Sequence, residues 1–392
     1  MRSFLYAVFF LLLQASLNGS PLYSPSWGFR LDLPEGYQYA EGNGKDRFSF
    51  LGPDNLQFDI RVYNGEYASI EELAADVNRR LGNRGDTDFF MYREKNAAII
   101  SLNTETFNGW SLCIELEGKN DDVPRPMLVA LSYSTVYNPS ADFFHISALD
   151  SIVPSEADRR YPGPIMEYAY PRGEQRETAL AKEGINALIR EGDAEAAQEL
   201  VDREFSLLCL YLDSDYWQEA WIRYYRAIFR DSWDRVSDAV FKLERKWNVW
   251  QDFGIDRNSS NKGVASERGV ADRAFAEKAL AFVQGFEYER NFEGSDFVNL
   301  VSAVTEGRGD CDTRAVLWAM ILSNANIPAA IMVSRNHSHA MGLAVLTGSG
   351  ARFKAAGTEW MVAETTAPVN IGLIAQDVSD VGSWLAVIFE SE

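Results

Sequence analysis

A breaker-free apolar run behind two glycines constrains the C-terminal part of the chain more than any other feature. Gly307 and Gly309 interrupt regular structure, and Asp310 is a favourable helix N-cap residue. The run from Asp312 to Leu322 contains neither glycine nor proline. This pattern predicts a mostly buried helix with Cys311 in its first turn.

The first turn of a helix changes the chemistry of a thiol. Unpaired backbone N–H groups and the positive end of the helix dipole favour an anion, which lowers the pKa of a cysteine there and can hold a developing oxyanion. Asp310 and Asp312 flank Cys311 and oppose a second negative charge. A nucleophilic role for Cys311 therefore needs a nearby base.

Three downstream segments provide candidates for that base and for its partner. Residues 326–334 predict a helix end followed by a strand, and residues 338–346 predict a strand that begins with His339. Residues 359–368 predict a third strand that ends in Glu364. A thiol on a helix, an imidazole and a carboxylate are the nucleophile, base and orienting group of a catalytic triad.

These residues resemble the transglutaminase-like superfamily, which is related to papain. The family pattern appears here as Gly309-Asp310-Cys311, Ile327-Pro328-Ala329, His339-Ala340, and Trp360 followed by Glu364-Thr365, with a lead-in helix near 274–288. The resemblance covers about 265–372. It implies a papain-like α+β domain at 262–392, with the cysteine at a helix start and the histidine and acid on antiparallel strands.

The resemblance implies that Cys311 is the nucleophile, His339 the general base and later acid, and Glu364 the partner that orients the imidazole. The sequence departs from the family at Met341, where an aromatic residue is usual, and at Glu364, where Asp is commoner.

Alternatives remain for two of these roles. His337 is the competing base, and Glu359 is the competing acid, although the two-residue strand period places Glu359 on the opposite face from Glu364. No cofactor is expected. Some exported members of the family hold calcium near the catalytic helix, and Asp310 and Asp312 could supply ligands.

The N-terminal region, residues 25–155, predicts an α/β unit. Apolar residues alternate in several short segments separated by turns. Ser69–Leu81 predicts an amphipathic helix capped by Ser69, with Glu72 three residues on, and Ala141–Ile152 predicts a closing helix. This layout, with the phrase from Phe29 to Gly36, resembles the PsbP/Mog1-like α/β sandwich. That resemblance assigns no chemistry by itself.

The central region, residues 174–251, predicts helices rich in aromatic side chains. Aromatic residues at helical spacing usually form a core, although such a stripe can also stack bases or sugars. A proline- and glycine-containing linker at 161–173 precedes this region. A polar connection at 252–269 follows it. Taken together, the three regions predict an α+β chain.

The first twenty residues have the three parts of a secretory signal peptide: Arg2, an apolar core at 4–13 and small residues before Pro21. An uncleaved N-terminal anchor is the alternative. The chain is therefore expected to be exported, to the periplasm or the extracellular space, without a membrane span after cleavage. Its three cysteines leave at least one thiol unpaired. A Cys113–Cys209 disulfide would leave Cys311 free, and otherwise both residues are expected to be buried and inert.

Acidic residues exceed basic ones by 57 to 37, which gives a net charge of −20. This balance argues against nucleic acid as a partner. We expect an exported cysteine enzyme that acts on amide bonds, as a protease, amidase or acyltransferase, with protein or cell-wall peptides as substrates. The alternative is a non-catalytic exported binding protein with the same fold.

Overall fold

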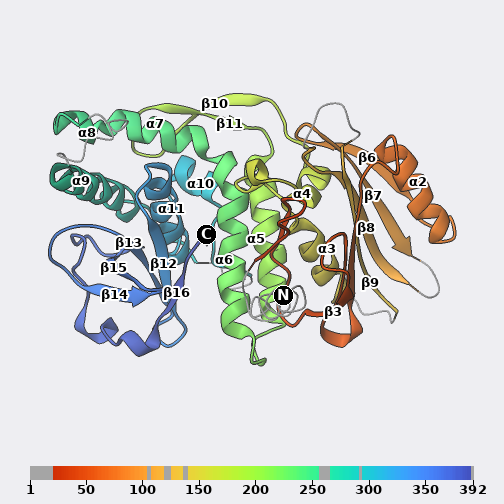
Figure 1. Cartoon of the computed structure of the whole chain (residues 1–392). Coiled ribbons are helices and arrows are strands. Elements are labelled where there is room, and N and C mark those ends of the chain that lie inside the picture. Colours follow the sequence, from red (N-terminus) through yellow and green to blue (C-terminus); the bar gives the residue numbers. More distant parts are fainter. Residues whose placement is uncertain are drawn as a thin grey trace, which may run out of the picture. The chain divides into compact units, whose positions relative to one another are not determined.

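The computed structural model describes residues 21–103, 107–118, 125–135, 140–255, 265–290 and 294–389 (Figure 1). The chain is mixed α and β with several antiparallel sheets, as predicted. It divides into two compact units. Unit 1 comprises Met1–Pro171 and Arg203–Tyr224, and unit 2 comprises Arg172–Asp202 and Tyr225–Glu392. The predicted signal peptide at 1–20 and residues 256–264 of the predicted connection lie outside the described residues.

Unit 1 is built on a seven-stranded antiparallel sheet with the order β3-β4-β5-β9-β8-β7-β6. Its strands are β3 (Gln38–Gly42), β4 (Arg47–Leu51), β5 (Gln57–Tyr63), β6 (Thr87–Tyr92), β7 (Lys95–Asn103), β8 (Asn108–Glu115) and β9 (Met127–Ser134). Two short strands, β1 (Leu22–Tyr23) and β2 (Arg30–Leu31), form a separate pair.

Two helices of unit 1 cover opposite faces of this sheet. Helix α2 (Ile70–Arg80) packs on β6, β7 and β8, and α3 (Ala141–Asp150) packs on β8 and β9. The predicted cap of α2 is confirmed, because the Glu72 N–H donates to the hydroxyl of Ser69 and the Glu72 carboxylate accepts from the Ala68 N–H. Alternate strand residues therefore belong to two cores, one with each helix.

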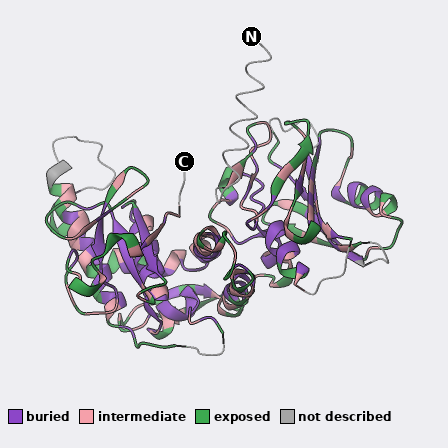
Figure 2. Ribbon diagram, turned by 90° about the horizontal axis from the view of Figure 1, so that it is seen from below, coloured by how far each residue is buried: buried purple, intermediate pink, exposed green. Residues whose placement is uncertain are grey.

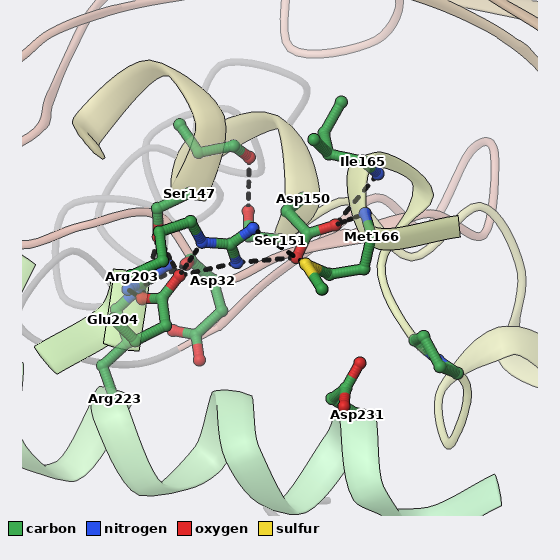
Figure 3. A network of polar contacts seen from close by, with 12 residues as sticks. Asp32, Ser147, Asp150, Ser151, Ile165, Met166, Arg203, Glu204, Arg223 and Asp231 are labelled. Carbon is green, nitrogen blue, oxygen red and sulfur yellow. Dashed lines mark hydrogen bonds and ion pairs between the residues drawn. The ribbon is translucent and has the colours of Figure 1, made fainter. Parts of the chain in front are cut away.

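A buried ion-pair network holds the helical part of unit 1 together (Figure 3). Helix α4 (Pro164–Ala169), the end of α5 (Asp193–Cys209) and the start of α6 (Trp217–Arg235) contribute to this unit. Arg203 contacts Asp150 and Glu204, and Arg223 contacts Glu204 at 2.7 Å. The Ser147 hydroxyl also donates to Glu204. Two buried cations thus face two buried anions, so no charge in this network is left uncompensated.

Unit 2 contains a five-stranded antiparallel sheet with the order β14-β15-β13-β12-β16. The strands are β12 (Ala329–Ser334), β13 (His339–Ala344), β14 (Arg352–Ala355), β15 (Thr358–Ala363) and β16 (Leu385–Val387). A hairpin of β10 (Gln175–Ala179) and β11 (Asn186–Arg190) lies apart from this sheet in the pairing. The remaining helices are α7 (Ser237–Trp247), α8 (Val249–Asp252), α9 (Ala265–Gln284), α10 (Leu300–Glu306) and α11 (Cys311–Asn324).

Helix α11 packs on β12 and β13 and also contacts α7, α9 and α10, so it is buried almost all round (Figure 2). Gly342 allows this close packing, because a Cβ atom there would lie 2.4 Å from the ring of Trp318. The other face of the sheet carries a second core that includes Met341, Trp360 and Val362. The sheet therefore separates two apolar layers, and α11 belongs to the layer that packs on β12 and β13.

Several features of the central region differ from expectation. Residues 174–251 contain β10 and β11 beside the predicted helices and are divided between the two units. Half of their twelve aromatic residues are buried, whereas Tyr216 and Phe241 are exposed. All three cysteines are free thiols. Cys113 is buried as expected, whereas the expectation for Cys209 is wrong, because it lies exposed at the end of α5.

In the described part of the chain, the helices that are long enough to cross a bilayer are too polar to do so.

Candidate functional site

Cys311 is the first residue of α11, as its sequence context predicts. The carboxylate of Asp310 caps the helix by accepting the Thr313 N–H at 2.8 Å. Gly309 is required for this cap, since a Cβ atom at that position would lie 2.6 Å from the Thr313 side chain. Cys311 itself is only 7% exposed. The local sequence thus fixes the thiol at a buried helix start.

The thiol of Cys311 donates a hydrogen bond to Oδ1 of Asp312, at 3.3 Å. The phenol of Tyr225 donates to the other oxygen of the same carboxylate, Oδ2. Tyr225 is fully buried in unit 2. Asp312 therefore connects a buried tyrosine to the candidate nucleophile.

Burial and the two flanking acids raise the pKa of the Cys311 thiol, and the Ala340 backbone N–H opposes this rise. Burial, together with the charge of Asp312, also raises the pKa of Asp310 to about 8. The net effect is opposite to the lowering expected from the helix dipole. The thiol is therefore neutral near pH 7 until a base removes its proton.

His339 and Glu364 meet because of strand topology. His339 begins β13, Glu364 directly follows β15, and these two strands are antiparallel neighbours. The start of one strand therefore lies beside the end of the other. Nε2 of His339 lies 2.8 Å from Oε2 of Glu364. The other ring nitrogen, Nδ1, makes no hydrogen bond within the described residues.

The Glu364 carboxylate is held in place by further contacts. Its Oε1 accepts hydrogen bonds from the backbone N–H and the hydroxyl of Thr366, at 2.7 Å and 2.6 Å. The Gln284 amide donates to the backbone carbonyl of Glu364. Burial favours the protonated form, but the hydrogen bonds from His339 and Thr366 dominate and lower the pKa of Glu364 to about 2. Glu364 is therefore an ionised acceptor for the imidazole.

The two alternative residues occupy other positions. Glu359 is exposed on β15 and forms an ion pair with Arg352 at 3.8 Å. His337 lies in the turn before β13 and stacks on the ring of Trp384, with centroids 5.5 Å apart. Within the described residues, neither forms a hydrogen bond or ion pair with His339 or Glu364.

The structure brings His339 and Glu364 together but does not join Cys311 to His339 by a hydrogen bond. Within the described residues, the thiol donates to Asp312 instead. Cys311 lies close to β13, since the Ala340 N–H acts on its pKa, and the charge of His339 acts on Asp312. Asp312 is thus electrostatically coupled to both residues.

Two aromatic neighbours of this site were not predicted from the sequence. The ring of Trp384 lies edge-on to His339, with centroids 6.2 Å apart. Burial, together with the neighbouring Cys311, raises the pKa of Tyr288 to about 12. Tyr288 belongs to the lead-in segment that resembles the family, which is the one signal that could have identified it. No periodic pattern marks Trp384.

Asp310, Cys311 and Asp312 place three potential metal-ligand atoms within 4.8 Å of one another. Calcium prefers six to eight oxygen ligands. Here Oδ1 of Asp310 caps the helix, and both Asp312 oxygens accept hydrogen bonds. This group therefore fits calcium poorly.

Comparisons with known proteins leave the family of this chain open. No family model matches the sequence, and no curated protein matches it. A crystal structure from Bacteroides thetaiotaomicron shares 12% sequence identity over 69% of this chain and 81% of that chain. Its TM-score is 0.22, so this likeness carries no argument about fold or function. The transglutaminase-like and PsbP/Mog1-like resemblances stay predictions.

Proposed function

We propose that the protein is an exported, transglutaminase-like cysteine enzyme that acts on amide bonds through Cys311, His339 and Glu364. The observation that carries the proposal is the 2.8 Å contact between Nε2 of His339 and the Glu364 carboxylate. An ionised carboxylate fixes the ring orientation and stabilises the imidazolium that forms when the histidine takes a proton. Nδ1 is then the nitrogen available to the thiol.

In the proposed reaction, His339 removes the thiol proton of Cys311 as the sulfur attacks the substrate carbonyl carbon. Backbone N–H groups at the start of α11 stabilise the oxyanion. The imidazolium then gives its proton to the leaving amine, the C–N bond breaks, and a thioester remains on Cys311. Water or a second amine, deprotonated by His339, attacks the thioester and releases an acid or a new amide.

Burial of the thiol next to two acids explains why the base is needed. The raised pKa of Cys311 leaves little free thiolate at neutral pH, so reactivity depends on the imidazole rather than on the helix start alone. Protein or cell-wall peptides in the periplasm or the extracellular space are the substrates that this proposal implies. Whether water or an amine completes the reaction depends on access to the thioester.

Alkylation by iodoacetamide tests the proposal, with the exposed Cys209 as a reference thiol in the same molecule. We expect the rate at Cys311 relative to Cys209, measured by peptide mass spectrometry at pH 7.5, to fall at least about tenfold in His339→Ala. His337→Ala is the matched control and should retain the wild-type ratio. An unchanged ratio in His339→Ala, with Cys311→Ala matching wild type in substrate screens, would contradict the proposal.

The second candidate is a non-catalytic exported binding protein. It is favoured by one observation, namely that the Cys311 thiol donates to Asp312 and not to His339 in the described structure. A neutral thiol held by a carboxylate is a stable resting arrangement. The same alkylation experiment separates the candidates, because a binding protein needs no dependence of Cys311 reactivity on His339.

A further inference from the structure

Unit 1 has a groove of about 660 Å³ on the sheet face beside α2. Helix α2 packs on β6, β7 and β8, and the groove is lined by residues of β3, β4, β5 and β9 together with the end of α2. We propose that this groove binds a short zwitterionic peptide, whose carboxylate lies between Arg47 and Arg61 and whose ammonium group lies at Asp59. This proposal does not depend on the activity of Cys311.

Strand register arranges the charges of the groove in two neighbouring rows. Arg47 of β4 lies directly opposite Arg61 of β5. Two residues along the strands, Ser49 lies opposite Asp59, and Glu41 of β3 lies opposite Ser49. Residues two apart on a strand share a face, so the basic row and the acidic row both line the groove, roughly 7 Å apart.

In the part of the chain that the structure describes, the arginines of the basic row have no anionic partner. Among the described residues, the Arg47 guanidinium makes no ion pair or hydrogen bond, and the Arg61 guanidinium contacts only the ring of Tyr63, at 4.5 Å. Like charges directly opposite each other destabilise a sheet. A bound anion would compensate the repulsion between these two arginines.

The acidic row retains acceptor capacity. Asp59 accepts hydrogen bonds from the hydroxyls of Ser49 and Tyr133, but it forms no ion pair within the described part of the chain. A carboxylate can accept about four hydrogen bonds, so Asp59 can also accept a ligand ammonium group. Opposite charges thus lie in adjacent rows without pairing with each other.

A zwitterionic peptide matches these rows better than a simple anion does. An arginine pair suits a carboxylate, and one or two peptide units span the spacing of roughly 7 Å, since each extended residue covers about 3.3–3.6 Å. Val129 and Leu131 give the groove an apolar floor for small side chains. A lone inorganic anion would leave Asp59 unmatched. The groove volume lies in the usual range for small-ligand sites.

Isothermal titration of the full chain with di-alanine tests this assignment. N-acetyl-di-alanine and di-alanine amide each remove one charge of the ligand. Arg47→Gln/Arg61→Gln and Asp59→Asn each remove one row of the site, and Arg84→Gln, an exposed arginine outside the groove, is the control for net charge. Circular dichroism melting curves verify that every variant is folded.

We expect di-alanine to bind the wild type and Arg84→Gln equally. The double arginine variant, Asp59→Asn and both capped dipeptides should each weaken binding at least about tenfold, because each change removes charge-assisted hydrogen bonds between ligand and groove. The proposal is overturned if di-alanine does not bind, if capping either end has no effect, or if inorganic phosphate binds as tightly as di-alanine.

Discussion

Nε2 of His339 and the carboxylate of Glu364 form a 2.8 Å hydrogen bond across the neighbouring ends of β13 and β15. Glu364→Gln keeps a hydrogen-bond acceptor but removes the negative charge that stabilises an imidazolium. We therefore expect this substitution to lower the relative alkylation rate of Cys311 by about 10-fold to 100-fold. Glu359→Gln, on the exposed face of β15, is the matched control. Equal relative alkylation rates of Cys311 in both variants would contradict a role for Glu364 in this site.

Asp312 holds the Cys311 thiol as a neutral hydrogen-bond donor. Asp312→Asn removes a charge that raises the thiol pKa, so the thiolate fraction should increase about tenfold for each unit by which that pKa falls. Measuring Cys311 alkylation against pH, with Cys209 as the reference, checks this. A titration of Cys311 that does not move to lower pH in Asp312→Asn would show that Asp312 does not control the thiol.

Glu204 is the shared anion of the buried network in unit 1. Although burial alone would raise the pKa of Glu204, Arg223 and Arg203 lower it to about 2. Glu204→Gln removes the carboxylate that pairs with both buried arginines. We expect this substitution to reduce the free energy of unfolding by about 3–5 kcal/mol. Glu199→Gln, exposed on the same helix, should change it by less than about 0.5 kcal/mol. Urea denaturation compares the two; similar midpoints would refute the expected role of the network.

His145 gives unit 1 a predictable sensitivity to acid. It is fully buried on α3, its Nδ1 contacts the Ser132 hydroxyl, and its Nε2 has no partner in the described structure. Burial lowers the pKa of His145 from 6.5 to about 4. Between these values the unfolded chain binds the proton more readily, so stability is fully present above pH 6.5 and falls as the pH decreases toward 4.

The expected loss from His145 is about 1 kcal/mol per pH unit across this window. His145→Asn keeps a polar group near Ser132 but removes the titration. The free energy of unfolding of this variant, measured in urea at pH 7 and pH 5, should decrease less than that of wild type. An identical decrease in both proteins would mean that His145 is not the group responsible.

Local sequence chemistry was enough to predict the parts of the site that depend on one element. The Asp310 cap and the glycines before it predict the start of α11, which the structure confirms. The two-residue strand period placed Glu359 on the opposite face from Glu364, and the structure leaves Glu359 exposed and away from His339. Such features follow from backbone geometry alone.

Contacts between distant elements could not be predicted in this way. The phenol of Tyr225 reaches Asp312 from α6, and Trp384 reaches His339 from the segment before β16. No spacing in the sequence encodes either approach, because each depends on tertiary packing. The β10–β11 hairpin was missed for a different reason. Most residues of β10 are exposed and polar, so it lacks the apolar alternation that marks a half-buried strand.

The central claim is that Cys311 forms a thioester that depends on His339. The most direct measurement is intact-protein mass spectrometry after acid quenching during incubation with a library of peptide amides. We predict an acyl adduct that maps to Cys311, is absent in Cys311→Ala and is at least about tenfold reduced in His339→Ala but not in His337→Ala. An adduct on Cys209 alone, or one on Cys311 that forms equally fast without His339, would contradict the central claim.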